Sequence, residues 1–147
     1  MSDLEVIQLV DELNELCKDL NGDLDINCGG CCYVAAMLAE GLFNLHIPYK
    51  VSITKCFEVE KSLVVRRFIK NKQDFYCQHA FIYLHKHKLY INDDGDADRN
   101  VKVGCIKPKE LLEYYKSTRW NKTYNIRNNK SVAKSINEIF KKYESKA

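Results

Sequence analysis

Residues 28–36 read Cys-Gly-Gly-Cys-Cys-Tyr-Val-Ala-Ala and lead into the longest uncharged apolar run of the chain, which extends to residue 39. This pattern predicts a helix that begins at about Cys31, directly after two glycines. The first N–H groups of a helix have no partner within it and that end is electropositive, so a thiolate is stabilised there relative to a thiol. The sequence therefore places Cys31 where a cysteine can act as a nucleophile.

A histidine and two polar residues follow Cys31 in the order that cysteine chemistry uses. His79 precedes one apolar run, and Asn92 and Asp93 follow the next. A cysteine nucleophile needs a base that takes its proton, and the base needs a group that fixes its orientation. The candidate catalytic residues are therefore Cys31, His79 and one of Asn92 and Asp93.

The composition indicates a single soluble domain. A chain of 147 residues is long enough for a hydrophobic core but too short for two domains, so we expect residues 1–147 to form one compact domain. The longest apolar run is too short to span a bilayer, and the first residues lack the apolar segment of a secretory signal, so no membrane partner is expected. A net charge of +3 does not indicate nucleic acid as a partner.

The cysteine content indicates a reducing compartment. The chain has seven cysteines, an odd number that cannot all pair within one chain. In a chain without a secretory signal, such cysteines are typical of free thiols rather than of a disulfide framework. We therefore expect a cytoplasmic protein, and we predict neither a cofactor nor a bound metal. The sequence carries no indication of oligomeric state.

Hydrophobic periodicity predicts an α+β domain. Residues 2–20 have helical spacing, Ser2 and Glu5 form a capping-box pattern, and Gly22 predicts the end of this helix. A second helix is predicted over residues 31–43. The predicted strands are 49–57 with 63–69 as its hairpin partner, 76–84 with 88–92 as a second hairpin, and 101–106; helices over 107–116 and 131–143 follow. Helices, then a mostly antiparallel sheet, then helices is an α+β order.

These motifs resemble the papain-like and transglutaminase-like superfamily of cysteine enzymes. Residues 28–31 are similar to the Cys-Gly-Ser-Cys segment of papain-type enzymes. The alanine four residues after Cys31 and the Ile-Pro-Tyr-Lys-Val of residues 47–51 are similar to elements of transglutaminase-like domains. The His-Ala-Phe-Ile-Tyr-Leu of residues 79–84, with a polar residue after the next strand, completes a resemblance that covers residues 27–95.

The resemblance implies a helix headed by the nucleophile and packed on an antiparallel sheet, whose strands carry the histidine and its orienting residue. It implies a hydrolase of the peptidase or amidase type that cleaves an amide, isopeptide or thioester bond in a peptide or protein through an acyl-enzyme intermediate. It also favours Asn92 over Asp93. The chain departs from papain-type enzymes at Cys32, where they have tryptophan, and at Asp25, where they have the glutamine of the oxyanion hole.

Several neighbours of Cys31 are candidates for binding the substrate. The amide N–H of Cys31 is one candidate oxyanion donor, and Asn27 or Gln78 is the candidate for a second. Gly29 and Gly30 have no side chains, so a substrate carbonyl could approach the backbone closely there.

Other functions remain open for the same residues. One is acyl transfer of the transglutaminase type, and another is a binding domain that keeps the fold without catalysis and holds Cys31 as a small buried hydrophobe. A further alternative is a zinc-stabilised module with Cys28, Cys31, Cys77 and His79 as ligands.

Overall fold

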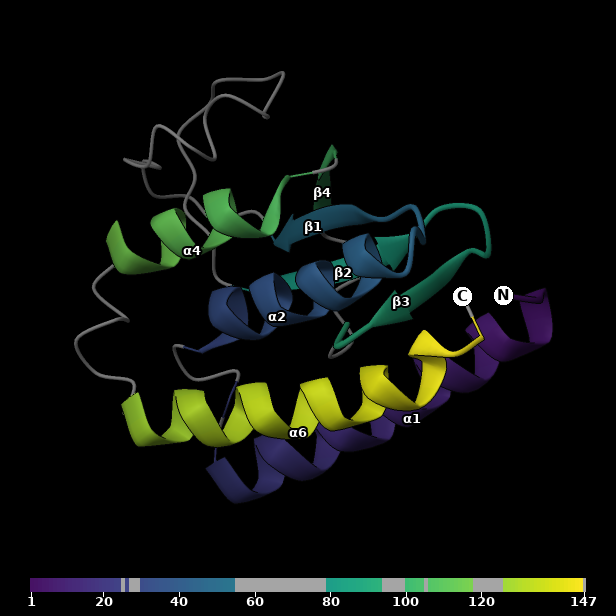
Figure 1. Cartoon of the computed structure of the whole chain (residues 1–147). Coiled ribbons are helices and arrows are strands. Elements are labelled where there is room, and N and C mark those ends of the chain that lie inside the picture. The colour runs from purple at the N-terminus through teal and green to yellow at the C-terminus, as the bar shows by residue number, and fades with distance from the viewer. Residues whose placement is uncertain are drawn as a thin grey trace.

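A central helix, α2 (Cys31–Asn44), lies between a pair of helices and a β-sheet (Figure 1). The structure, a computed structural model, describes residues 1–24, 26, 30–54, 79–93, 100–104, 106–117 and 126–146, with backbone alone at 53–54, 100–104, 114–117 and 126–128. The other helices are α1 (Asp3–Leu24), α4 (Pro108–Ser117) and α6 (Ile126–Glu144), and the strands are β1 (Lys50–Thr54), β2 (Ala80–Leu84), β3 (Leu89–Ile91) and β4 (Asn100–Gly104). Within these residues no helix is both long and apolar enough to cross a membrane.

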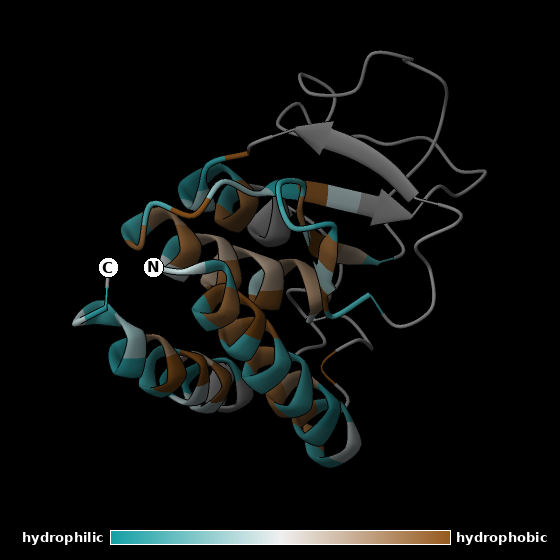
Figure 2. Cartoon of the chain, turned by 90° about the vertical axis from the view of Figure 1, so that its right-hand side faces the viewer, coloured by the Kyte–Doolittle hydropathy of each residue, from teal (hydrophilic) through white to brown (hydrophobic). Residues whose placement is uncertain are grey.

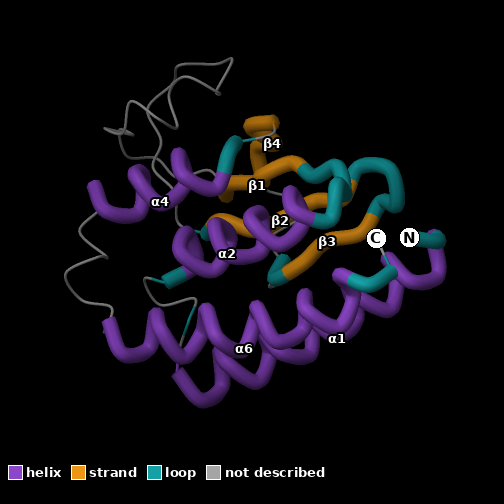
Figure 3. The backbone as a smooth tube through the Cα atoms, in the orientation of Figure 1, coloured by secondary structure: helices purple, strands orange, loops and turns teal. Residues whose placement is uncertain are grey.

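The described strands form one antiparallel sheet in the order β3-β2-β1-β4. The hairpin of β2 and β3 has Ile82 opposite Ile91 and Tyr83 opposite Tyr90. In Figure 3 the strands lie together on one side of α2, and α1 and α6 lie on the other. The α+β class and the antiparallel β2–β3 hairpin are therefore as the sequence predicts.

Helix α1 begins where the capping-box pattern predicts and ends later than expected. The Ser2 hydroxyl accepts a hydrogen bond from the Glu5 N–H at 3.1 Å, and a Glu5 carboxylate oxygen accepts one from the Ser2 N–H at 3.1 Å. The Ser2 N–H and the Ser2 hydroxyl, which donates to the same carboxylate oxygen at 2.9 Å, lower the pKa of Glu5 below its usual value. The prediction that Gly22 ends the helix is wrong, because α1 continues through it to Leu24. A glycine at this position costs helix stability without interrupting the backbone hydrogen bonds.

Helix α2 is buried on nearly all of its sides, which explains why its sequence lacks a polar stripe. It contacts α4, α6 and β2, and its buried residues include Val34, Leu38 and Leu42. A helix that is apolar all round is stable in water only when other elements cover it. Fully burying one leucine or valine side chain contributes about 1.5–3 kcal/mol, so the covering of α2 is a major part of the core.

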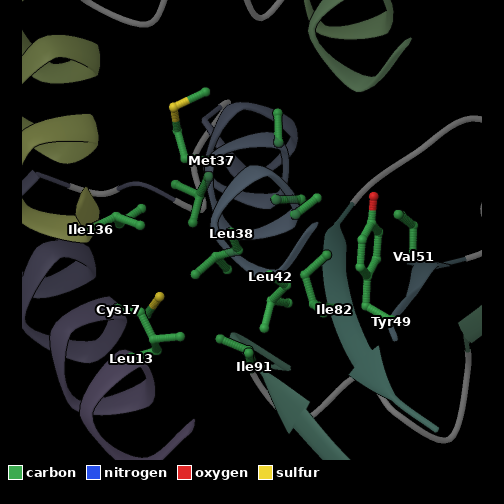
Figure 4. Packing of buried hydrophobic residues seen from close by; sticks show 14 of the residues in the cluster. Leu13, Cys17, Met37, Leu38, Leu42, Tyr49, Val51, Ile82, Ile91 and Ile136 are labelled. Atoms are coloured by element: carbon green, nitrogen blue, oxygen red, sulfur yellow. The ribbon is translucent and has the colours of Figure 1, made fainter. Parts of the chain in front are cut away.

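The hydrophobic core joins the four helices with β1, β2 and β3. In Figure 2 the brown, apolar sides of the helices face inward and the teal sides face outward. Figure 4 shows buried side chains of α1, α2, α6 and the sheet pointing toward one another: Leu13, Cys17, Leu38, Leu42, Ile82, Ile91 and Ile136. The side chains of Ala80, Ile82 and Leu84 belong to this core, so this face of β2 is the one that packs against α2.

The remaining boundaries differ in part from the sequence predictions. Helix α6 begins at Ile126, five residues before the predicted start, and includes the buried Asn129 despite the low helix propensity of asparagine. Residues 55–57 and the predicted strand 63–69 lie outside the described residues. Among the described residues, strand β1 pairs with β2 on one side and with β4 on the other.

Two glycines, each within a helix, lead to opposite expectations for substitution by alanine. At Gly22 an added Cβ meets nothing within 4 Å, so Gly22→Ala should stabilise the protein by about 0.5–1 kcal/mol through helix propensity. At Gly41 an added Cβ would overlap the ring of Phe140 on α6. The ring would have to shift, so Gly41→Ala should destabilise by about 1–3 kcal/mol.

Urea unfolding of the two variants and the parent protein measures both effects. A Gly41→Ala variant at least as stable as the parent would show that α2 and α6 do not approach this closely.

Candidate active site

Cys31 is the first residue of α2, as the sequence predicts. Gly30 precedes it as the N-cap residue, with φ −106° and ψ 0°, and the first turn of the helix contains only uncharged residues. No acidic side chain in this turn offsets the electropositive end of the helix, which is the end where a thiolate is favoured, whereas burial of a thiol opposes its ionisation. The Cys31 side chain is 4% exposed, and Cys32 beside it is equally buried.

The first residue of α2 and the residue before β2 lie at the same end of the molecule. In Figure 1, α2 runs in the same direction as β2, and β3 returns in the opposite direction. Helix α2 packs on β2. His79 immediately precedes β2 and Asn92 immediately follows β3, so both lie at the end of the sheet where the neighbouring helix α2 begins with Cys31.

A short hydrogen bond holds the imidazole of His79. Its Nε2 lies 2.6 Å from the backbone carbonyl oxygen of Asn92. A carbonyl oxygen only accepts, so Nε2 carries the proton in this bond. In the neutral ring the lone pair is then on Nδ1, which is the nitrogen able to accept a proton. Residue 92 thus contacts the second ring nitrogen of His79 through its main-chain carbonyl oxygen.

Aromatic packing restricts the same imidazole. The ring of His79 stacks on Phe81, with centroids 5.4 Å apart and planes 23° apart, and Phe81 in turn contacts Tyr90 at 5.8 Å. His79 is 5% exposed. Because alternate residues of a strand share a face, His79 lies with Phe81 on the face of β2 opposite the core residues Ala80 and Ile82. The stacking and the carbonyl bond together fix where the ring lies.

A residue that sequence reasoning missed, Asn14 of α1, holds the end of β3. Its Nδ2 donates to the Tyr90 carbonyl at 2.9 Å, and its Oδ1 accepts from the Asn92 N–H at 2.9 Å. Asn92 has a φ of 62°, in the left-handed region. The sequence offered no signal for Asn14, because a polar residue within an amphipathic helix is usually solvated and its partners are 76 and 78 residues away.

A shallow cavity lies beside this hydrogen-bonded junction. It has a volume of about 370 Å³ and is lined by residues of α1 and of the end of β3. Asp93, the other candidate for orienting the histidine, lines this cavity. The remaining lining residues come from both elements and are mostly polar: Asn14, Cys17, Lys18, Asn21, Tyr90 and Asn92.

The other predicted site residues lie outside the described part of the chain. They are the oxyanion and substrate-binding candidates Asn27, Gly29 and Gln78, the residue Asp25, and the zinc-ligand candidates Cys28 and Cys77. Among the described residues, no group of three or more histidine, cysteine or acidic side chains could hold a metal ion.

Cys17 provides a reference for an inert thiol in the same protein. It lies in the middle of α1, within the core. Burial raises the pKa of Cys17 to about 12, because the thiolate would lose its hydration. Cys17 lacks the helix-start position that distinguishes Cys31.

The main-chain contact at residue 92 leads to a prediction for substitutions there. Glycine adopts a φ of 62° readily, whereas a β-branched residue is strained by about 1–2 kcal/mol in this region. Asn92→Gly should therefore keep the carbonyl bond to His79, and Asn92→Val should be the less stable of the two by about that amount. Urea unfolding compares their stabilities, and the NMR resonance of the His79 Nε2–H reports the bond. Loss of that resonance in folded Asn92→Gly would show that the side chain holds the histidine.

Comparison of the chain with protein-family models finds no match, and comparisons with curated proteins and with solved structures find none either.

Proposed function

We propose that this protein is a cysteine-dependent hydrolase that cleaves an amide, isopeptide or thioester bond in a peptide or protein. The observation that carries this proposal is the 2.6 Å bond from His79 to the Asn92 carbonyl, at the end of the molecule where Cys31 begins α2. The bond leaves Nδ1 of His79 as the basic nitrogen. A thiolate nucleophile requires an imidazole beside it at an electropositive helix start, so the proposal requires the ring of His79, which precedes β2, to reach the thiol of Cys31.

The proposed reaction has two stages. His79 Nδ1 takes the proton of the Cys31 thiol, and the sulfur attacks the carbonyl carbon of the substrate. The proton then passes from His79 to the leaving amine or thiol as the bond to it breaks, which leaves an acyl group on Cys31. In the second stage His79 removes a proton from water, which attacks the acyl group and releases the acid and the free thiol.

The electropositive start of α2 would also stabilise the oxyanion that forms in each stage. The Cys31 amide is the candidate donor within the described residues, and loss of one such donor typically reduces the rate by ~10²–10³. Transfer of the acyl group to an amine instead of water would use the same residues, so acyl transfer of the transglutaminase type is the closest alternative reaction.

A second candidate function is supported by the burial of Cys31. With 4% of its surface exposed, Cys31 resembles a core residue as much as a nucleophile, and it packs in the same hydrophobic cluster as Cys17. A binding domain that keeps the fold without catalysis would have such a cysteine. The two functions differ in the predicted acidity of the Cys31 thiol.

The pH dependence of thiol alkylation tests the proposal. We expect Cys31 to react with iodoacetamide with an apparent pKa well below the ~8.5 of a free cysteine, because His79 and the helix start stabilise its thiolate. Cys17, with its pKa of about 12, should stay unmodified over the same range and serves as the internal reference. Site-resolved mass spectrometry follows each thiol separately.

Two variants identify the source of the effect. In His79→Gln the amide can still donate to the Asn92 carbonyl but cannot act as a base, so the low apparent pKa of Cys31 should be lost. His85→Ala, in the turn between β2 and β3, removes a histidine of the same hairpin and should leave the Cys31 profile unchanged. Equal, slow labelling of Cys31 and Cys17 in the parent protein would refute the hydrolase and favour the binding domain.

A further inference from the structure

We propose that Asn14 of α1 is a positioning residue for His79, acting through the backbone of Asn92. The inference rests on the proposed function, in which His79 is the base. Asn14 holds the peptide group on the N-terminal side of the Asn92 Cα, and His79 is bonded to the carbonyl on its C-terminal side. One side chain of the first helix thereby fixes the group that orients the imidazole.

The first step of the argument is the geometry at the edge of the sheet. Strand β3 is one of the two edge strands of the described sheet, and the Tyr90 carbonyl and the Asn92 N–H point to the edge away from β2. The Asn14 amide bonds to both, each at 2.9 Å, as a neighbouring strand would. It therefore fixes the chain over three residues, from Tyr90 to Asn92, rather than at one point.

The second step is the conformation of Asn92. At a φ of 62° the chain turns sharply, and the Asn92 carbonyl points to His79 rather than continuing the pattern of β3. This conformation is unfavourable for a residue other than glycine, so surrounding contacts must maintain it. The bond from the Asn92 N–H to Asn14 is a contact at the residue itself.

The third step is the rigidity of Asn14. Its neighbours in the helix, Leu13 and Cys17, are buried in the core, so the backbone of α1 is anchored at this position. The helix contacts both α6 and β3. An amide carried by an anchored helix can hold a strand end more firmly than a surface loop would.

A purely structural role for Asn14 predicts a different outcome. If its bonds only stabilise the fold, their loss would lower the free energy of unfolding and leave His79 unchanged in the folded protein. If Asn14 positions His79, their loss changes the imidazole and the Cys31 thiol even when the protein is fully folded.

The test substitutes Asn14→Leu, which has nearly the same shape, removes both hydrogen bonds and has the higher helix propensity. We expect the NMR resonance of the His79 Nε2–H, protected by its carbonyl bond in the parent protein, to be lost through exchange with water. We also expect alkylation of Cys31 at neutral pH to slow about tenfold, because a rise of one unit in the thiol pKa reduces the thiolate about tenfold. Asn14→Ala gives the same comparison if the leucine variant does not fold.

Two further variants serve as controls. Asn14→Asp keeps an oxygen that accepts from the Asn92 N–H, so it should retain more of the His79 resonance than Asn14→Leu does. Gln8→Ala removes an exposed amide from the same helix and should match the parent protein in both measurements.

A folded Asn14→Leu or Asn14→Ala variant with the parent His79 resonance and the parent Cys31 profile would overturn the inference. The NMR measurement does not depend on Cys31. If Cys31 of the parent protein proves inert, the hydrolase proposal fails, and the His79 resonance still shows whether Asn14 controls the histidine.

Discussion

The fold depends on burying the apolar surface of α2 against other elements. This helix is apolar around nearly its whole circumference, so no single partner suffices, and the sheet, α4 and α6 each cover part of it. At Gly41 the absence of a side chain lets the ring of Phe140 on α6 pack against the backbone of α2. Because α2 is held from several sides, the position of its first residue relative to the sheet is fixed by the core rather than by a loop.

The candidate site takes its parts from two helices and one hairpin, which are far apart in the sequence. Helix α2 supplies Cys31, the start of β2 supplies His79, and the end of β3 supplies a carbonyl that α1 holds through Asn14. Each part sits at the end of an element that the core fixes. The left-handed residue Asn92 is the exception, since its conformation is maintained by hydrogen bonds on both of its sides.

Much of the architecture was accessible from the sequence because it is encoded locally. The Ser2–Glu5 capping box, the apolar run after Cys31 and the alternation on either side of the β2–β3 turn each specify an element through contacts of a few residues. The extension of α1 past Gly22 and the early start of α6 were missed, because packing elsewhere in the fold outweighs local propensity there. The hydrogen bonds of Asn14 could not be predicted from the sequence, because they join residues more than 70 positions apart.

The group that contacts the second nitrogen of His79 is a main-chain oxygen, which every amino acid possesses. Substitution at residue 92 cannot delete such a group, but can only redirect it by changing the backbone conformation. Over evolutionary time the identity of residue 92 could drift among residues that tolerate a left-handed turn, such as asparagine, aspartate and glycine, while the contact persisted. A family of such proteins would then show an invariant cysteine and histidine beside a third position that sequence alignment does not recognise.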